Sequence, residues 1–250
     1  MKFKHSDMLV YIAIGDAYCL ATEYIKLPKY KKLQYDALEL KTYLKHPTHN
    51  NNAGTYSDDC QMSIGVAEVL IDGPPYTKLS FANAWVRNFK RDPRDAYSRG
   101  FQKLLQRINT GQDLLEKIKP ISNKNGAAMR PVPLGVLKTP QEVLEVAKLQ
   151  ASITHNTPSG IFASQAVALM SYFSLHEDAP LDRDHLLSFL TSHLNASKIF
   201  KEPWSGRVKG PEVGVNTAWA VFELITSCRA LSDIIRQTIT LGVIQTRLDV

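Results

Sequence analysis

Residues 159–175, Ser-Gly-Ile-Phe-Ala-Ser-Gln-Ala-Val-Ala-Leu-Met-Ser-Tyr-Phe-Ser-Leu, decide the fold that we expect for this chain. Apolar residues occupy nearly every face of this segment, which predicts a helix buried in the middle of the protein. Residues 6–22 show the same character and predict a second central helix. Amphipathic patterns predict further helices at residues 59–71, 80–91, 96–108, 111–118, 140–153, 182–194, 215–227 and 229–241. Strand signals are scarce and no βαβ alternation is visible, so we expect one all-α domain over residues 1–250.

Composition bounds the possible partners. The chain has 250 residues, of which 44% are apolar, and a net charge of +6, which permits an anionic ligand without requiring one. The densest basic stretch, residues 26–32, holds four lysines and no run of interleaved aromatics, so we expect no nucleic-acid partner. Three widely spaced cysteines give neither a disulfide framework nor a zinc pattern. With no targeting segment and no apolar run of about 20 residues, we expect a cytoplasmic protein without a membrane partner.

The segment Thr55-Tyr56-Ser57-Asp58-Asp59-Cys60-Gln61 carries the clearest chemical signal. Ser57 is predicted to be the N-cap of the helix that follows, which places Asp58 and Asp59 in its first turn. Hard oxygen ligands grouped this closely suit Mg²⁺ or Mn²⁺. The alternative is that both carboxylates only complement the helix dipole.

Asp16 and Glu23 lie seven residues apart on the first predicted helix, so both carboxylates can share one face. The alternative is that Asp16 is a satisfied buried cap and that Glu23 lies on the surface at the end of the helix. In the loop of residues 123–131, small residues allow a ligand to approach the backbone closely. Arg130 either reaches a phosphate or carboxylate or pins this loop. His155, at a helix junction, is either a ligand contact or a structural hydrogen-bonding group.

Taken together and in this order, these segments resemble the ADP-ribosylglycohydrolase family, of the dinitrogenase-reductase-activating glycohydrolase type. The resemblance rests on Gly15-Asp16-Ala17 with Glu23, Tyr56-Ser57-Asp58-Asp59-Cys60, Asn125-Gly126-Ala127-Ala128-Met129-Arg130 and Thr154-His155. It runs from residue 8 to about residue 242. It implies an orthogonal all-α bundle, a site for two Mg²⁺ or Mn²⁺ ions, and hydrolysis of a bond that joins ADP-ribose to a protein side chain or a related compound.

The resemblance also assigns roles to residues. The metal ligands would be Ser57, Asp58 and Asp59, and the catalytic residues would be Glu23, Asp58 and Asp59, with Glu23 beside the ribose as a base or a gate. ADP-ribose would contact Asn125, Gly126, Ala127, Ala128, Met129, Arg130 and His155. A metal pair positions a water, lowers its pKa and polarises the ribose hydroxyls.

Two features depart from the family pattern. Ser57 and Cys60 replace the threonines of its T-D-D-T motif, and Cys60 brings a thiol close to a hard ion. After Gly242, the family's G-G-D-T-D-T motif is absent from residues 243–250, although one inserted base in a possible coding sequence restores it. The hypothesis is therefore a frameshifted, prematurely ended member with impaired activity. The alternative is a catalytically inactive protein that binds ADP-ribose.

Overall fold

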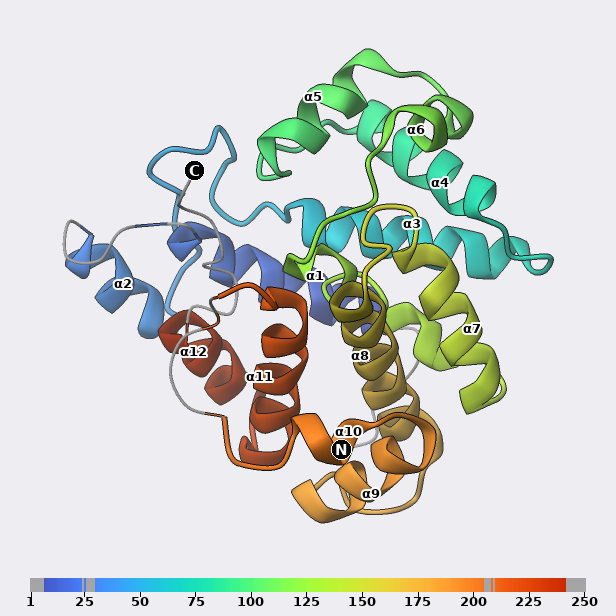
Figure 1. Cartoon of the computed structure of the whole chain (residues 1–250). Coiled ribbons are helices and arrows are strands. Elements are labelled where there is room, and N and C mark those ends of the chain that lie inside the picture. The colour runs from blue at the N-terminus through green and yellow to red at the C-terminus, as the bar shows by residue number, and fades with distance from the viewer. Residues whose placement is uncertain (1–6, 24, 26–29, 205–207, 209, 242–250) are drawn as a thin grey trace.

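The centre of the protein is the long helix α8 (Pro158–His176), in which apolar side chains on nearly every face are covered by neighbouring elements. The computed structural model describes residues 7–23, 25, 30–204, 208 and 210–241. Helices α7 (Pro140–Ala151) and α11 (Val213–Ser227) and the 3-10 helix η4 (Val132–Val136) pack around α8. Figure 1 shows α8 between these elements. The continuous apolar surface of residues 159–175 is thus satisfied by burial on several sides.

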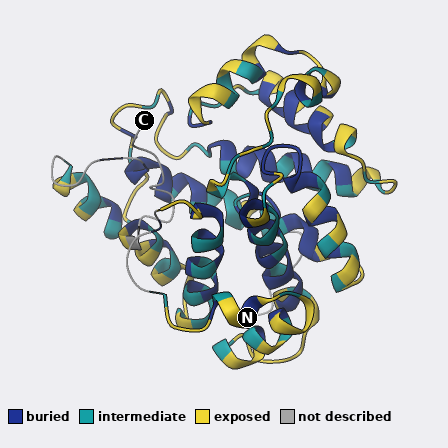
Figure 2. Cartoon of the chain, viewed as in Figure 1, coloured by how far each residue is buried: buried dark blue, intermediate teal, exposed yellow. Residues whose placement is uncertain are grey.

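A second layer is built on α3 (Asp58–Asp72), which packs along α4 (Lys78–Arg91). Trp85 of α4 is almost fully buried in the main core and donates from its indole nitrogen to the carbonyl oxygen of Met62, at 3.2 Å. Helices α5 (Arg99–Arg107) and α6 (Gly111–Lys117) cover the outer side of α4. Figure 2 shows that α3 and α8 are largely buried, whereas α5 and α9 (Arg183–His193) are exposed along one side.

The first helix α1 (Met8–Cys19) continues into the 3-10 turn η2 (Leu20–Thr22) and crosses the start of α3. Helices α2 (Lys31–Leu38) and α12 (Leu231–Leu241) pack beside it. A short helix, α10 (Ala196–Ile199), follows α9, and a 3-10 turn, η3 (Asn125–Ala127), lies in the loop between α6 and α7. The start of α3 lies against the C-terminal half of α1, because Asp16 of α1 bonds to Ser57 at the start of α3.

The all-α prediction is confirmed, and each predicted segment contains a helix. Over the described ranges no strand is formed, and the sole β-type pairing is an isolated bridge between Ile121 and His155. Helices α2 and α10 were not predicted, because α2 buries little besides Ala37 and α10 has four residues. None of the described helices is long and apolar enough to cross a membrane. Residues 242–250, on which the frameshift hypothesis depends, lie outside the described residues.

Candidate functional site

The two adjacent carboxylates lie where the sequence places them. Ser57 is the N-cap residue of α3, and Asp58 and Asp59 stand in its first turn. The Ser57 hydroxyl does not cap its own helix but donates to Asp16 Oδ1 at 2.6 Å. Asp16 Oδ2 accepts from the backbone N–H groups of Ser57 at 2.7 Å and Cys60 at 3.1 Å. A carboxylate from α1 therefore satisfies the free amides that begin α3, which ties the two helices together.

Several acidic groups share this small region. Burial is the main cause that raises the pKa of Asp59 well above its ordinary value, and Asp58 and Asp16 raise it further. The pKa of the buried Cys19 thiol is also raised, first by burial and then by Asp16, Asp59 and Glu23. Glu23 is buried, with 4% of its surface exposed, so the alternative that places it on the protein surface is wrong. These negative charges oppose one another at the start of α3.

The loop of residues 125–130 packs against the next turn of α3. Ser63 of α3 donates from its hydroxyl to the carbonyl oxygen of Met129 at 3.5 Å. Within the loop, Ala127 and Ala128 are buried, whereas Asn125, Gly126 and Met129 keep part of their surface. The exposed part of the loop is therefore limited to those three residues.

Arg130 is almost fully buried, with 1% of its surface exposed. Its guanidinium donates to Gln150 Oε1 and to Thr154 Oγ1, each at 2.7 Å, and lies 4.2 Å above the ring of Trp85. Burial lowers the pKa of Arg130 to about 9, so the group stays charged at neutral pH. Asp58 favours that charge. These contacts favour the alternative in which Arg130 pins the loop.

His155 lies directly behind Gly126. A Cβ atom on Gly126 would stand 2.8 Å from His155 Cε1, so only glycine fits there without a shift of the ring. Thr154 Oγ1 accepts from Arg130 and lies 2.6 Å from His155 Nδ1, which links the ring to the guanidinium. Burial, with a smaller effect of Arg130, lowers the pKa of His155 to about 3. The ring is therefore neutral.

A family model described as ADP-ribosylglycohydrolase matches residues 7–240. The chain belongs to the ADP-ribosylglycohydrolase family. It is also similar to an uncharacterized protein of Archaeoglobus fulgidus, with 24% identity over 171 residues, or 68% of this chain. That stretch spans 55% of the length of the Archaeoglobus protein.

The sequence did not reveal the contacts that hold the 120–130 loop in place. Asn156 donates its backbone N–H to the carbonyl oxygen of Pro120 at 2.7 Å, and Gly214 donates to that of Asn123 at 3.0 Å. The 120–130 loop is therefore fastened to the start of α8 and of α11. No sequence signal marks these bonds, because backbone groups of any residue can make them.

Another missed support lies on the opposite side of the α3 acids. Gln61 donates from its amide to the carbonyl oxygen of Asp92 at 2.7 Å and accepts from the Tyr97 hydroxyl at 2.9 Å. Tyr97 is buried, and burial, Asp58 and Asp59 all raise its pKa. The segment after α4 thus packs over the first turn of α3.

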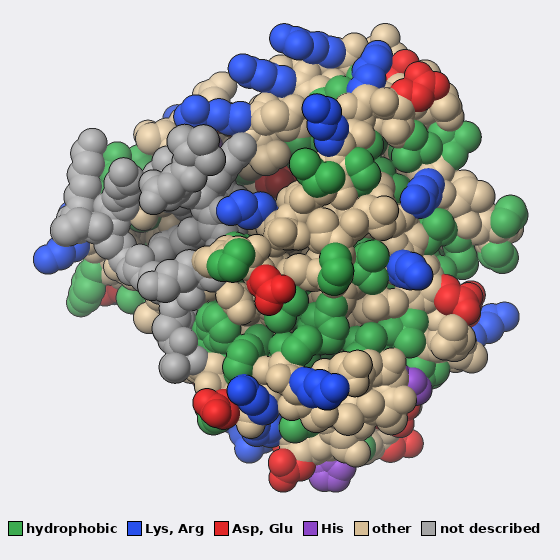
Figure 3. All heavy atoms as spheres, in the orientation of Figure 1, with side chains coloured by type: hydrophobic (Ala, Val, Ile, Leu, Met, Phe, Trp, Pro, Cys, Tyr) green, Lys and Arg blue, Asp and Glu red, His purple; other side chains and the backbone are tan. Residues whose placement is uncertain are grey.

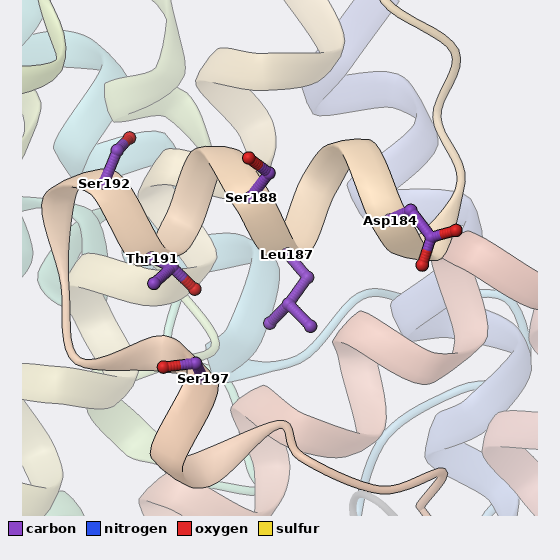
Figure 4. Close-up of a pocket in the computed structure, with 6 residues that line it drawn as sticks. All are labelled: Asp184, Leu187, Ser188, Thr191, Ser192 and Ser197. Carbon is purple, nitrogen blue, oxygen red and sulfur yellow. The ribbon is translucent and has the colours of Figure 1, made fainter.

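Outside this region, Figure 3 shows Lys and Arg side chains spread over the visible face rather than gathered in one stripe. A separate surface pocket lies beside α9 and α10 (Figure 4) and is lined by Asp184, Leu187, Ser188, Thr191, Ser192 and Ser197. It contains hydroxyls and one carboxylate but none of the residues predicted to act on ADP-ribose. The region around the start of α3 is therefore the candidate functional site.

Proposed function

We propose that this protein is a metal-dependent hydrolase that removes ADP-ribose from a modified protein side chain or a related ADP-ribosyl compound. The observation that carries the proposal is that α3, which begins with Asp58 and Asp59, packs through Ser63 and Met62 against the loop of residues 125–130, within the matched region of the family model. Hydrolysis of an ADP-ribosyl bond needs groups that activate water and a loop that holds the nucleotide, and this region offers candidates for both.

A divalent cation fits the chemistry of the donor set. Ser57, Asp58 and Asp59 offer hard oxygen atoms. Burial, followed by the like charges of Asp58 and Asp16, raises the pKa of Asp59, and a cation would relieve the repulsion between these charges. In the described part of the chain, no three His, Cys, Asp or Glu side chains converge as a ready ligand cluster. We therefore propose that Ser57, Asp58 and Asp59 hold Mg²⁺ or Mn²⁺ largely through water, which Mg²⁺ retains readily. The bound ion would supply a water of lowered pKa.

The remaining roles follow from exposure. We propose that Asn125, Gly126 and Met129 contact ADP-ribose, since they keep surface, and that the backbone N–H of Gly126 faces its phosphates. His155 supports this loop from behind as a neutral ring. Glu23 would take a proton from the attacking water. Arg130 would hold the loop in place and keep positive charge beneath it.

The test is product analysis. The purified chain, with Mg²⁺ or Mn²⁺, is incubated with an ADP-ribosylated protein, and mass spectrometry follows both the free ADP-ribose and the restored side chain. We expect stoichiometric release of both that stops when a chelator is added. The alternative, an ADP-ribose-binding protein without turnover, predicts a rise in melting temperature with ADP-ribose but no release. No response in either assay would refute both proposals.

A further inference from the structure

His46 lies outside every segment that carries the family resemblance, yet it connects two parts of the candidate site. Its ring is buried, with 3% of the residue surface exposed. Nε2 lies 2.7 Å from the carbonyl oxygen of Glu23. On the other side of the ring, Nδ1 accepts from the backbone N–H groups of Thr48 at 3.1 Å and His49 at 2.9 Å.

These bonds fix the state of the imidazole. Because two backbone N–H groups point at Nδ1, that nitrogen holds a lone pair and the proton is on Nε2. Nε2–H therefore donates to the Glu23 carbonyl. The groups that act on the ring are His49, whose ring is tilted by 30° with its centre 3.9 Å away, and Asp95. Burial lowers the pKa of His46, so the ring is neutral at pH 7.

His46 gives the Glu23 carbonyl oxygen a donor from another segment of the chain. Residue Glu23 ends the 3-10 turn η2 with extended backbone angles (φ −65°, ψ 136°), so helical bonding no longer satisfies its carbonyl oxygen. A donor replaces the water that a buried carbonyl oxygen loses on folding. His46 supplies the donor, and it comes from the loop that leads to Ser57 and the α3 acids.

The same loop is fastened at its middle to the segment after α4. Asn50 donates its backbone N–H to Asp95 Oδ2 at 2.9 Å, and the Asn51 amide donates to the carbonyl oxygen of Asp95. The loop is thus anchored by Asp95 on one side and by His46 and Glu23 on the other, just before α3 begins.

We infer that His46 is a positioning residue for the hydrolase reaction. Its ring clamps the backbone of Glu23 to the loop that leads to the α3 acids. The inference rests on the proposed function, in which Glu23 takes a proton from water. Loss of the clamp would let Glu23 move relative to Asp58 and Asp59. A displacement of about 1 Å in a reacting group costs up to about 100-fold in rate.

Two variants separate the two halves of the clamp. His46→Gln carries an amide nitrogen that reaches as far as Nε2, so it keeps a donor for the Glu23 carbonyl. His46→Asn is too short for that bond, but its side-chain oxygen still accepts from backbone N–H groups two and three residues on, as in an Asx-turn. Both variants keep the loop polar and uncharged.

A matched control exists at the far end of α8. His176 Nε2 lies 3.0 Å from the carbonyl oxygen of Gly135, a bond of the same kind. It lies roughly 27 Å along α8 from the end that meets the site. His176→Gln should therefore leave turnover unchanged.

The experiment measures kcat and KM for release of ADP-ribose, with melting temperature as a check on folding. We expect kcat to fall by about 10- to 100-fold in His46→Asn with little change in KM, and to stay near wild type in His46→Gln and His176→Gln. Equal losses in the two His46 variants, or no loss in either, would overturn the inference.

A readout that needs no activity keeps the clamp testable by itself. The ¹⁵N chemical shifts of the His46 ring report which nitrogen carries the proton. A neutral ring protonated at Nε2 supports the clamp, and a cationic or Nδ1-protonated ring at pH 7 overturns it. Absence of turnover in the wild-type chain counts instead against the proposed function, and with it against the catalytic consequence of the clamp.

Discussion

Replacement of Arg130 by lysine tests whether this residue holds the loop or contacts the ligand. Lysine keeps the charge but reaches one of the two side-chain partners, Gln150 or Thr154, that the guanidinium contacts at 2.7 Å. A lost hydrogen bond to a charged group costs about 1.5–3 kcal/mol. Loss of the stacking on Trp85 adds about 0.5–2 kcal/mol. We expect Arg130→Lys to lower the free energy of unfolding by about 2–5 kcal/mol, a large part of the roughly 5–15 kcal/mol of a typical domain.

The assay is urea unfolding followed by circular dichroism, together with ADP-ribose binding by titration calorimetry under native conditions. Arg183→Lys is the matched control, because Arg183 contacts Glu223 at 2.8 Å and lies over the ring of Phe222, but its side chain is 29% exposed. The control should lose less stability, since solvent screens exposed ion pairs. Unchanged stability in Arg130→Lys combined with a tenfold loss of ADP-ribose affinity would refute the loop-pinning role.

Further changes at the site have distinct expected results. Gly126→Ala places a Cβ atom 2.8 Å from His155 Cε1, so it should cost about 1–3 kcal/mol in thermal unfolding and weaken ADP-ribose binding; unaltered binding and stability would contradict the close packing. Asp59→Asn should raise the melting temperature at pH 7, because the pKa of Asp59 is raised and its charge is therefore disfavoured in the folded chain. Turnover should be lost in the same variant. A lower melting temperature would contradict this prediction. The pKa of His155, lowered to about 3, predicts that the free energy of unfolding falls as the pH drops below 6.5, by up to about 1.4 kcal/mol per pH unit. The reason is that the unfolded chain takes up a proton that the buried ring does not. This slope should be lost in His155→Gln, and an unaltered slope in that variant would contradict the prediction.

The helices could be predicted because each buries a local apolar pattern that the sequence displays directly. The positions of Ser57, Asp58 and Asp59 followed from capping preferences, and the structure confirms them. A buried capping role for Asp16 was one of the alternatives that the sequence left open, but the helix that it caps could not be predicted, because the bond joins residues 41 apart in the chain. Side-chain preferences describe neighbours in sequence, whereas that bond depends on how α1 crosses α3.

Arg130 shows a second limit of sequence reasoning. Arginine is rarely fully buried, so a loop arginine beside small residues suggests an exposed ligand contact. The structure satisfies its charge internally with Gln150, which no motif marks, and with Thr154, which the sequence marks only as the neighbour of His155. His46 escaped notice for a different reason, since its partners are backbone groups.

The measurement that tests the central claim most directly is the rate of ADP-ribose release by the wild-type chain, Asp58→Asn and a control variant, Asp113→Asn. Asp113 also lies in the first turn of a helix, α6, where it accepts from backbone N–H groups at the N-terminus, and 34% of its side chain is exposed. If the α3 acids carry the chemistry, Asp58→Asn abolishes metal-dependent release and Asp113→Asn retains it. Release that survives in a folded Asp58→Asn chain would contradict the account, and would leave the α3 acids with the role of complementing a helix dipole.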